Sequence, residues 1–251
     1  AVVRLISYRR NVSMQRNIAH LLDSAKGRTI AWCEGDDVWL SSDKLARQVE
    51  ALERDAAAAL CFHDVLEIDD KGATVTPSKL TKVMKVEPPP RLTSRETALG
   101  VLIPTCAALH RRLPLPPVRL WEHIVNVDTF VFAHVCRHGD AVRIDGIHAA
   151  HRLHPGGVWS TKSRIAKNMC TLESRLALVR TLGAPDDLAA CEAGLRLTRV
   201  MCLTVGRRFL VRYFVPCAKY AVVYPALWLK LATMRALGKF GRRRTVEAAR
   251  P

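Results

Sequence analysis

Paired cysteines are missing from this sequence, although its 251 residues include eight cysteines. No two of them lie close enough to form a CxxC pair, and several, such as Cys33 and Cys61, stand within apolar runs. This pattern favours small buried thiols over zinc knuckles or a disulfide framework. Because free thiols persist in reducing compartments, we expect a cytoplasmic protein.

Long apolar runs are missing as well. Between residues 198 and 239 the longest uncharged stretch covers residues 220–229, well below the ~18 to 20 apolar residues that a membrane-spanning helix needs. The chain also opens without a charged leader or a small-residue cleavage site, so its start is not typical of a secretory signal. It begins on the apolar run Val2–Ile6, which predicts a buried strand entered in its middle.

Positive charge is abundant, with a formal net charge of +16. From residue 180 onward, 14 lysines and arginines stand against 4 acidic residues. Such a region suits an anionic partner, but no nucleic-acid-binding motif accompanies it, so we expect no nucleic acid. We expect residues 163–251 to form a basic helical region. It could lie peripherally on the inner face of the cell membrane, or pack as a helical subdomain over the sheet.

Apolar periodicity over residues 1–162 predicts an α/β domain. Strands are expected at 2–6, 29–33 and 57–65, and helices at 11–26 (capped by Asn11) and from about residue 42, the latter burying Leu45, Val49 and Leu52. Alternating strands and helices at this spacing favour βαβ units in a mainly parallel sheet. A loop is expected at 76–92, a short helix at 94–99, a buried helix at 126–138, and strands at 103–109, 141–144 and 147–152.

An acidic motif, Glu34-Gly35-Asp36-Asp37, follows the predicted strand 29–33. Ligands of open α/β sheets bind at the carboxyl ends of strands. Two or three carboxylates there can hold Mg²⁺ or Mn²⁺ against a diphosphate, because these ions prefer oxygen ligands. Alternatively, Asp36 and Asp37 form an Asx turn that caps the next helix.

Two sequence blocks resemble bacterial family-two glycosyltransferases. The first runs from Lys26 to Trp39 and continues with Lys44-Leu45 and Gln48-Val49; the second comprises Asp128, Gly139 and the segment His151–Ser160, HRLHPGGVWS. Together they cover roughly residues 1–162. The resemblance implies a GT-A fold, which is a Rossmann-like, mainly parallel sheet flanked by helices, here with a C-terminal helical extension. It also implies metal-dependent transfer of a sugar from a nucleotide-sugar donor, with inversion, to a hydroxyl group of a glycan or lipid-linked acceptor.

The resemblance assigns the metal and donor contacts. Asp36 would be the chief carboxylate on a Mg²⁺ or Mn²⁺ ion, Glu34, Asp37 and His154 would support it, and Arg152 would meet the donor diphosphate. Gly156 and Gly157 would let the backbone approach the ligand closely, or they could simply form a tight turn.

The resemblance makes Asp128 the candidate general base, and its place in the first turn of a helix would help to keep the carboxylate ionised. It could equally be one of the acidic residues common in first helical turns. Four other histidines are interpreted as packing or surface residues: His63, His110, His134 and His138. His63 and His110 could instead line the acceptor side.

The sequence also departs from the family. His151 stands where family members usually have Tyr, and the family's first two βα units, which hold the nucleotide base and ribose, have no counterpart before Ala1. We therefore expect an enzyme whose donor binding depends on a preceding segment. The alternative is a non-catalytic, truncated glycosyltransferase-like protein that binds anionic membrane surfaces.

Overall fold

A computed structural model describes residues 3–99, 102–159 and 161–181. They belong to a compact unit spanning residues 1–197. Most of the predicted basic region, including the segment 198–251 expected at a membrane surface, lies outside the described residues. Within them, no helix combines the length and the apolar character needed to cross a bilayer.

Seven strands form the sheet of this unit. They are β1 (Thr29–Ala31), β2 (Val38–Trp39), β3 (Ala58–Ile68), β4 (Thr74–Thr76), β5 (Arg91–Leu92), β6 (Leu109–Arg111) and β7 (Asp140–Arg152). The helices are α1 (Met14–Ser24), α2 (Lys44–Arg54), α3 (Lys79–Met84), α4 (Ser94–Leu99), α5 (Val127–Val135) and α6 (Arg164–Thr181), with 3₁₀ turns η1 (Thr105–Ala107), η2 (Val118–Leu120) and η3 (Cys136–His138).

The predicted mainly parallel, Rossmann-like GT-A sheet is wrong. The strand order is β1-β6-β3-β7-β2, with β4 on β3 and β5 on β7. Of the described strand pairs, only β3 with β7 is parallel. β1 and β3 do run in the same direction on either side of α2, but the antiparallel β6 lies between them. Apolar runs indicate strands without indicating their neighbours, and that is why the prediction failed.

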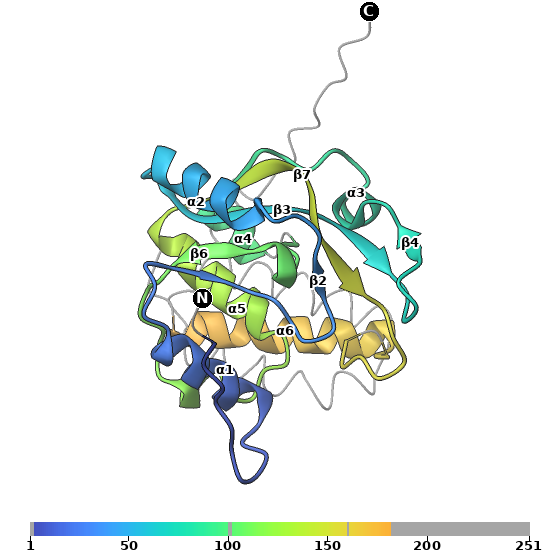
Figure 1. Ribbon diagram of the computed structural model, residues 1–251. Helices are drawn as coiled ribbons and strands as arrows, with labels where there is room; N and C mark the ends of the chain where they lie inside the picture. The colour runs from blue at the N-terminus through green and yellow to red at the C-terminus, as the bar shows by residue number, and fades with distance from the viewer. Residues whose placement is uncertain (1–2, 100–101, 160, 182–251) are drawn as a thin grey trace, which may run out of the picture. The chain divides into compact units, whose positions relative to one another are not determined.

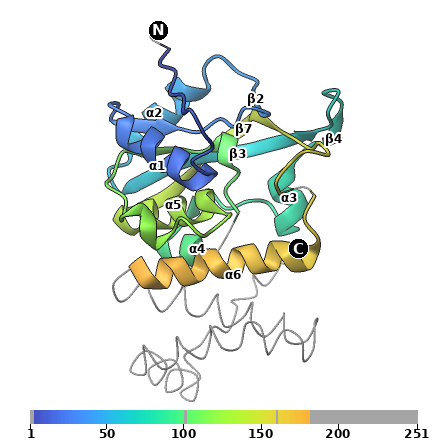
Figure 2. The same cartoon turned by 90° about the horizontal axis from the view of Figure 1, so that it is seen from below.

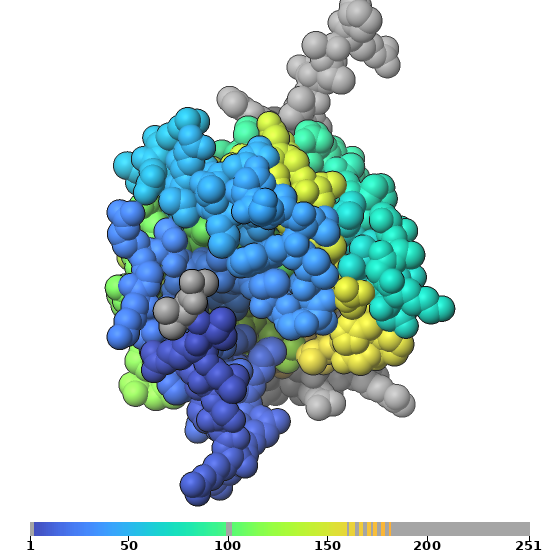
Figure 3. All heavy atoms as spheres, viewed as in Figure 1, coloured from blue at the N-terminus to red at the C-terminus, as the bar shows by residue number. Residues whose placement is uncertain are grey.

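Helices cover both faces of the sheet. α2 lies on one face and α4 and α5 on the other, with α6 packed outside α5 (Figures 1 and 2). In the space-filling view, light-blue residues of the segment through β2 and α2 cover the front of the sheet (Figure 3). Because both faces are covered, β3 is buried along almost its whole length, as a central strand of a two-sided sheet must be.

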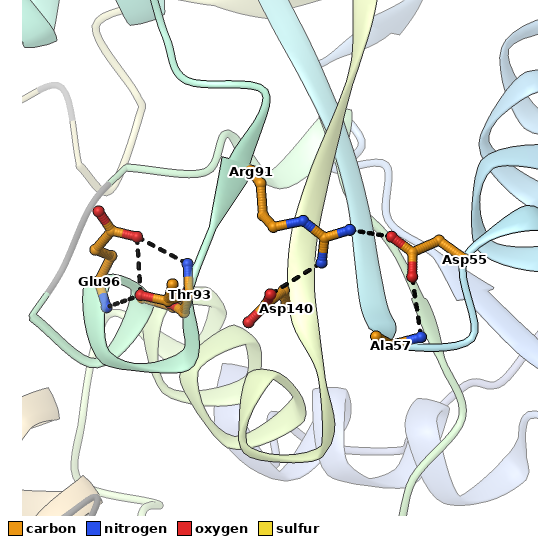
Figure 4. Close-up of polar contacts among 7 residues, drawn as sticks. Asp55, Ala57, Arg91, Thr93, Glu96 and Asp140 are labelled. Atoms are coloured by element: carbon orange, nitrogen blue, oxygen red, sulfur yellow. Dashed lines mark hydrogen bonds and ion pairs between the residues drawn. The ribbon is translucent and has the colours of Figure 1, made fainter.

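Arg91 of β5 joins the end of α2 to the start of β7. Its guanidinium lies between the carboxylates of Asp55 and Asp140, with 2.9 Å to Asp140 Oδ2 (Figure 4). Next to it, Thr93 and Glu96 form a reciprocal capping box at the start of α4, since each side chain accepts a hydrogen bond from the other's backbone N–H. The ion pairs are partly exposed, so their main effect is to fix where these ends meet.

The N-terminal elements differ from expectation. Val3 and Leu5 are 94% and 87% exposed, and residues 3–8 form no regular structure, so the predicted strand 2–6 is wrong. A strand needs a partner for its backbone groups, and β1 is paired only with β6 in the described part of the chain. The first helix is confirmed, but Ser13 caps it, while the predicted cap Asn11 accepts a hydrogen bond from the Ser13 N–H.

Several later boundaries also differ. The predicted loop 76–92 contains α3 and β5. The predicted strand 103–109 contains the η1 turn, and β6 begins only at Leu109. The two strands expected at 141–144 and 147–152 are one strand, β7, which follows β3 with shifts in register around Gly146, whose φ is +98°. The helices at 94–99 and 126–138 are confirmed, the latter ending in η3.

α2 buries a polar face. Lys44, Gln48 and Leu52, spaced four residues apart, are buried, whereas Leu45 is 38% exposed. The prediction that Leu45 packs inside is therefore wrong. The buried face follows from hydrogen-bond partners on the sheet, because Gln48 donates to the carbonyls of Cys61 and Ala107.

Three histidines lie in the core, in agreement with their interpretation as packing residues. One ring nitrogen of each forms a hydrogen bond with a backbone carbonyl. His63 Nδ1 bonds the carbonyl of Asp64, His110 Nδ1 that of Arg111, and His134 Nε2 that of Pro114. A carbonyl only accepts, so that nitrogen carries the proton. The second ring nitrogen is buried in each case and has no partner among the described groups. Burial therefore lowers the pKa of all three, that of His63 to about 4.

Acid should destabilise the protein through these histidines. Because their folded pKa lies below 6.5, the unfolded chain binds the proton first, so stability is complete above pH 6.5 and is lost as the pH falls toward about 4. For His63 the free energy of unfolding by urea should drop by about 1.4 kcal/mol per pH unit in this window. The lowered pKa values of His110 and His134 act in the same direction. His63→Gln should reduce this slope. An unchanged slope in His63→Gln would contradict the assignment.

Candidate functional site

The acidic motif lies on a loop that crosses the edge of the sheet. Residues 32–37 lead from β1, at one end of the strand order, to β2 at the other end (Figure 1). The crossing is held by Trp32 N, which donates to the Ala108 carbonyl at 3.2 Å, and by Leu40 N, which donates to the His148 carbonyl at 2.9 Å. β1, β3 and β7 point the same way, so their carboxyl ends share this edge. The predicted position of the motif is confirmed.

The motif itself forms a tight turn, in which Asp37 N donates to the Glu34 carbonyl at 3.1 Å. It does not cap the following helix, whose N-cap is Asp43. Asp37 Oδ1 accepts a hydrogen bond from the backbone N–H of Arg152 at 2.9 Å. The Asp37 carboxylate also interacts with the Glu34 side chain. The turn therefore presents carboxylates that helix capping does not use.

Arg152 fastens this turn to the sheet. Its Nε donates to the Asp36 carbonyl at 2.9 Å, and its Nη1 donates to the carbonyls of Asp69 and Asp70 at 3.0 and 3.3 Å. The guanidinium thus joins the loop after β1 to the turn after β3. The predicted contact of Arg152 with a donor diphosphate stays a prediction, because these carbonyls already occupy much of its hydrogen-bonding capacity.

His154 reaches the motif from the segment after β7. Its Nε2 lies 2.9 Å from Asp36 Oδ2, so two of the predicted metal ligands contact one another. A metal-bound imidazole nitrogen carries no proton, whereas this contact places a proton between nitrogen and carboxylate. His154 can therefore either hydrogen-bond Asp36 or ligate a cation through Nε2.

Asp128 lies in the first turn of α5, as predicted, and near the acidic motif. Its Oδ2 accepts a hydrogen bond from Thr105 Oγ1 at 3.1 Å. Its negative charge is among the charges that act on Glu34, although more than ninety residues separate the two in sequence. The fold thus brings the candidate base to the same edge as Glu34, Asp36 and Asp37.

Glu34 reports the combined field of these carboxylates. The pKa of Glu34 is raised to about 8. The largest cause is that surrounding protein atoms displace water; the charges of Asp37, Asp128 and Asp36 and a hydrogen bond to Asp37 add to it. The side chain is still accessible to solvent. Near neutral pH Glu34 thus keeps its proton, chiefly because protein atoms displace water around its carboxyl group and then because the neighbouring carboxylates are negative.

The oxygen ligands at this site suit a hard cation, but the protein supplies only part of its coordination shell. In the described region, no three histidine, cysteine or acidic side chains converge as ready-made ligands of one metal ion. Mg²⁺ commonly takes one or two protein carboxylates and completes its shell with phosphate oxygens and water. The Asp36 and Asp37 carboxylates fit an ion held in this way.

Sequence reasoning missed several residues near the site. The burial of Lys44 and Gln48, the contact of Lys44 with the partly exposed Trp39 ring, and the contact of Thr105 with Asp128 were not predicted. The spacing of Lys44 and Gln48, one helical turn apart, was visible in the sequence, but their polar character argued against burial. No sequence signal marked Thr105.

No protein-family model matches the chain. It is similar to proteins described as uncharacterized from Mycobacterium bovis and from two strains of Mycobacterium tuberculosis. Each is 27% identical over 158 residues, covering 59% of this chain and 41% of the relative. The similarity thus spans less than half the length of these curated relatives.

Proposed function

We propose that this chain supplies the catalytic part of a glycosyltransferase that moves a sugar from a nucleotide donor to a hydroxyl group, with inversion. One observation supports this function above the others: Asp128 lies near the acidic motif. Asp128 bonds Thr105 of η1, the next residue of η1 bonds Trp39 just after the motif, and the charge of Asp128 acts on Glu34. Transfer of this kind needs both a site that neutralises a leaving diphosphate and a base for the acceptor hydroxyl. The gathered carboxylates provide groups for both tasks.

In the proposed reaction, the acceptor oxygen attacks the anomeric carbon of the donor sugar and forms the new C–O bond. The bond from that carbon to the diphosphate oxygen breaks, and the nucleoside diphosphate leaves with the electron pair. Asp128 takes the proton of the acceptor hydroxyl. Thr105, which donates to Asp128 Oδ2, leaves the second carboxylate oxygen to accept this proton.

Asp36 and Asp37 would hold the cation, and Glu34 would join them once its proton is lost. A divalent cation there supplies Lewis-acid stabilisation of the leaving diphosphate. Arg152 keeps the loop at the carboxyl ends of β3 and β7 through its backbone contacts. The chain's own contribution is therefore to position opposing charges at one edge of the sheet.

Asp36→Asn should weaken Mn²⁺-dependent binding of a nucleoside diphosphate. Removing one charged oxygen ligand should raise the dissociation constant by about tenfold or more. Calorimetric titration of the full-length protein with UDP or GDP, with and without Mn²⁺, measures this. Asp145→Asn is the matched control, because the Asp145 side chain is 92% exposed and lies on β7 away from the motif.

Equal affinity in Asp36→Asn and the parent protein would place any metal site elsewhere. Metal-dependent nucleotide binding without release of nucleoside diphosphate from any nucleotide sugar would instead favour the non-catalytic alternative. Membrane contact through residues 198–251 stays a proposal from sequence alone, drawn from the basic residues there.

A further inference from the structure

The η1 turn links the candidate base to side chains of β2 and α2, since Thr105 bonds Asp128 while Trp39 and Gln48 bond the next two carbonyls of the turn. Thr105, its first residue, is half-buried and donates its hydroxyl hydrogen to Asp128 Oδ2 at 3.1 Å. Threonine has a restricted χ1 angle, so a fixed backbone at residue 105 also fixes its hydroxyl. The orientation of Asp128 therefore depends on how firmly η1 is held.

Two side chains hold η1 through its carbonyls. Trp39 Nε1 donates to the Cys106 carbonyl at 3.2 Å, and Gln48 Nε2 donates to the Ala107 carbonyl at 2.7 Å. Gln48 also donates to the Cys61 carbonyl of β3 at 3.3 Å, which joins the turn to the central strand. Cys106 and Ala107 are buried, so leaving these carbonyls unpaired would be costly.

Lys44 in turn orients both of these donors. Its Nζ donates to Gln48 Oε1 at 2.8 Å, which assigns the amide so that Nε2 faces η1, and it lies 4.4 Å from the centroid of the Trp39 ring. The Lys44 side chain is fully buried, and burial lowers its pKa to about 8. Burying a cation costs desolvation free energy that an aliphatic side chain would not cost. The Lys44 ammonium group, however, orients Gln48 and Trp39, which an aliphatic side chain could not do.

We propose that Thr105 is a positioning residue for Asp128, and that Lys44, Trp39 and Gln48 hold the η1 turn that carries it. This inference rests on the proposed function, because it gives Asp128 the role of base. Thr105 touches neither of the reacting atoms. It keeps one carboxylate oxygen engaged and thereby directs the other toward the acceptor hydroxyl.

The test compares Thr105→Val with Thr105→Ser in the full-length protein. Release of nucleoside diphosphate is measured from a panel of UDP-, GDP- and dTDP-sugars with soluble sugar acceptors, and binding of the free nucleoside diphosphate with Mn²⁺ is measured beside it. Valine keeps the shape and removes the hydroxyl, so kcat should fall about tenfold with nucleotide affinity unchanged. Serine restores the hydroxyl and should recover kcat to within about twofold of the parent.

Thr181→Val is the matched control, because the Thr181 hydroxyl bonds only carbonyls of its own helix among the described groups and lies far along the chain from Asp128. Thermal unfolding of each variant shows whether it is folded. If Thr105→Val does not fold, Trp39→Phe provides a second test. It keeps the ring beside Lys44 but removes the donor to Cys106, so it should also lower kcat and spare nucleotide affinity.

The outcomes separate the inference from the function on which it rests. If Asp128→Asn loses turnover while Thr105→Val keeps it, or if serine fails as badly as valine, the positioning role is overturned and the proposed function stands. If the parent protein turns over no nucleotide sugar, the proposed function fails and the positioning role fails with it.

Discussion

Asp128→Asn is expected to lower the turnover of a nucleotide sugar by a factor on the order of 10² or more, with little change in nucleotide affinity. An amide cannot accept the proton of the acceptor hydroxyl, but it keeps the size of the carboxylate and can still accept a hydrogen bond from Thr105. A general base acts in the transition state, so the loss should fall on kcat. Initial rates of nucleoside diphosphate release over a range of donor concentrations measure this.

Asp70→Asn controls for the loss of one negative charge at the same edge. Asp70 is exposed in the turn after β3, and Arg152 contacts its backbone carbonyl, which the substitution preserves. Asp70→Asn should keep turnover within about twofold of the parent. Near-normal turnover in Asp128→Asn would remove Asp128 as the base, and equal losses in the two variants would show that only net charge matters.

Gly139→Ala is expected to destabilise the fold by about 3 kcal/mol or more, because overpacking against backbone cannot be relieved by a change of rotamer. A Cβ at residue 139 would lie 2.5 Å from the Ala57 carbonyl oxygen and 2.9 Å from the Ala59 nitrogen. These atoms flank the start of β3, where Asp140 N donates to the Ala57 carbonyl at 2.9 Å. The added methyl group must push β7 away from β3, the central pair of the sheet.

Urea unfolding followed by tryptophan fluorescence measures the effect, with Gly35→Ala as the matched control. A Cβ at residue 35 meets nothing within 4 Å, so this variant should lie within about 0.5 kcal/mol of the parent. Similar free energies of unfolding for the two alanine variants would show that β7 can move without cost and would contradict the close packing described here.

Gly139 is constrained by a contact that its local sequence does not show. The residue follows η3, at the end of the helix predicted at 126–138. Its larger constraint is the approach to β3, which joins residues about eighty positions apart. Local sequence patterns carry no information about such a contact.

At the candidate site too, local patterns predicted the position of each segment but not the contact between them. The order of apolar runs and the acidic motif placed Glu34–Asp37 after a strand, and helical periodicity placed Asp128 in the first turn of α5. Neither pattern stated that the two segments meet. That juxtaposition required the loop to cross from β1 to β2 over the ends of β3 and β7, and no local propensity predicts this path.

The sequence by itself determined the helices α1, α2, α4 and α5, the main strands and the carboxylates at a strand end, because periodicity and turn residues act over a few positions. The tertiary structure alone decided the antiparallel insertion of β6, the burial of Lys44 and Gln48, and the contact of Thr105 with Asp128. Strand pairing depends on partners distant in sequence, and a polar side chain is buried only where distant groups satisfy its hydrogen bonds.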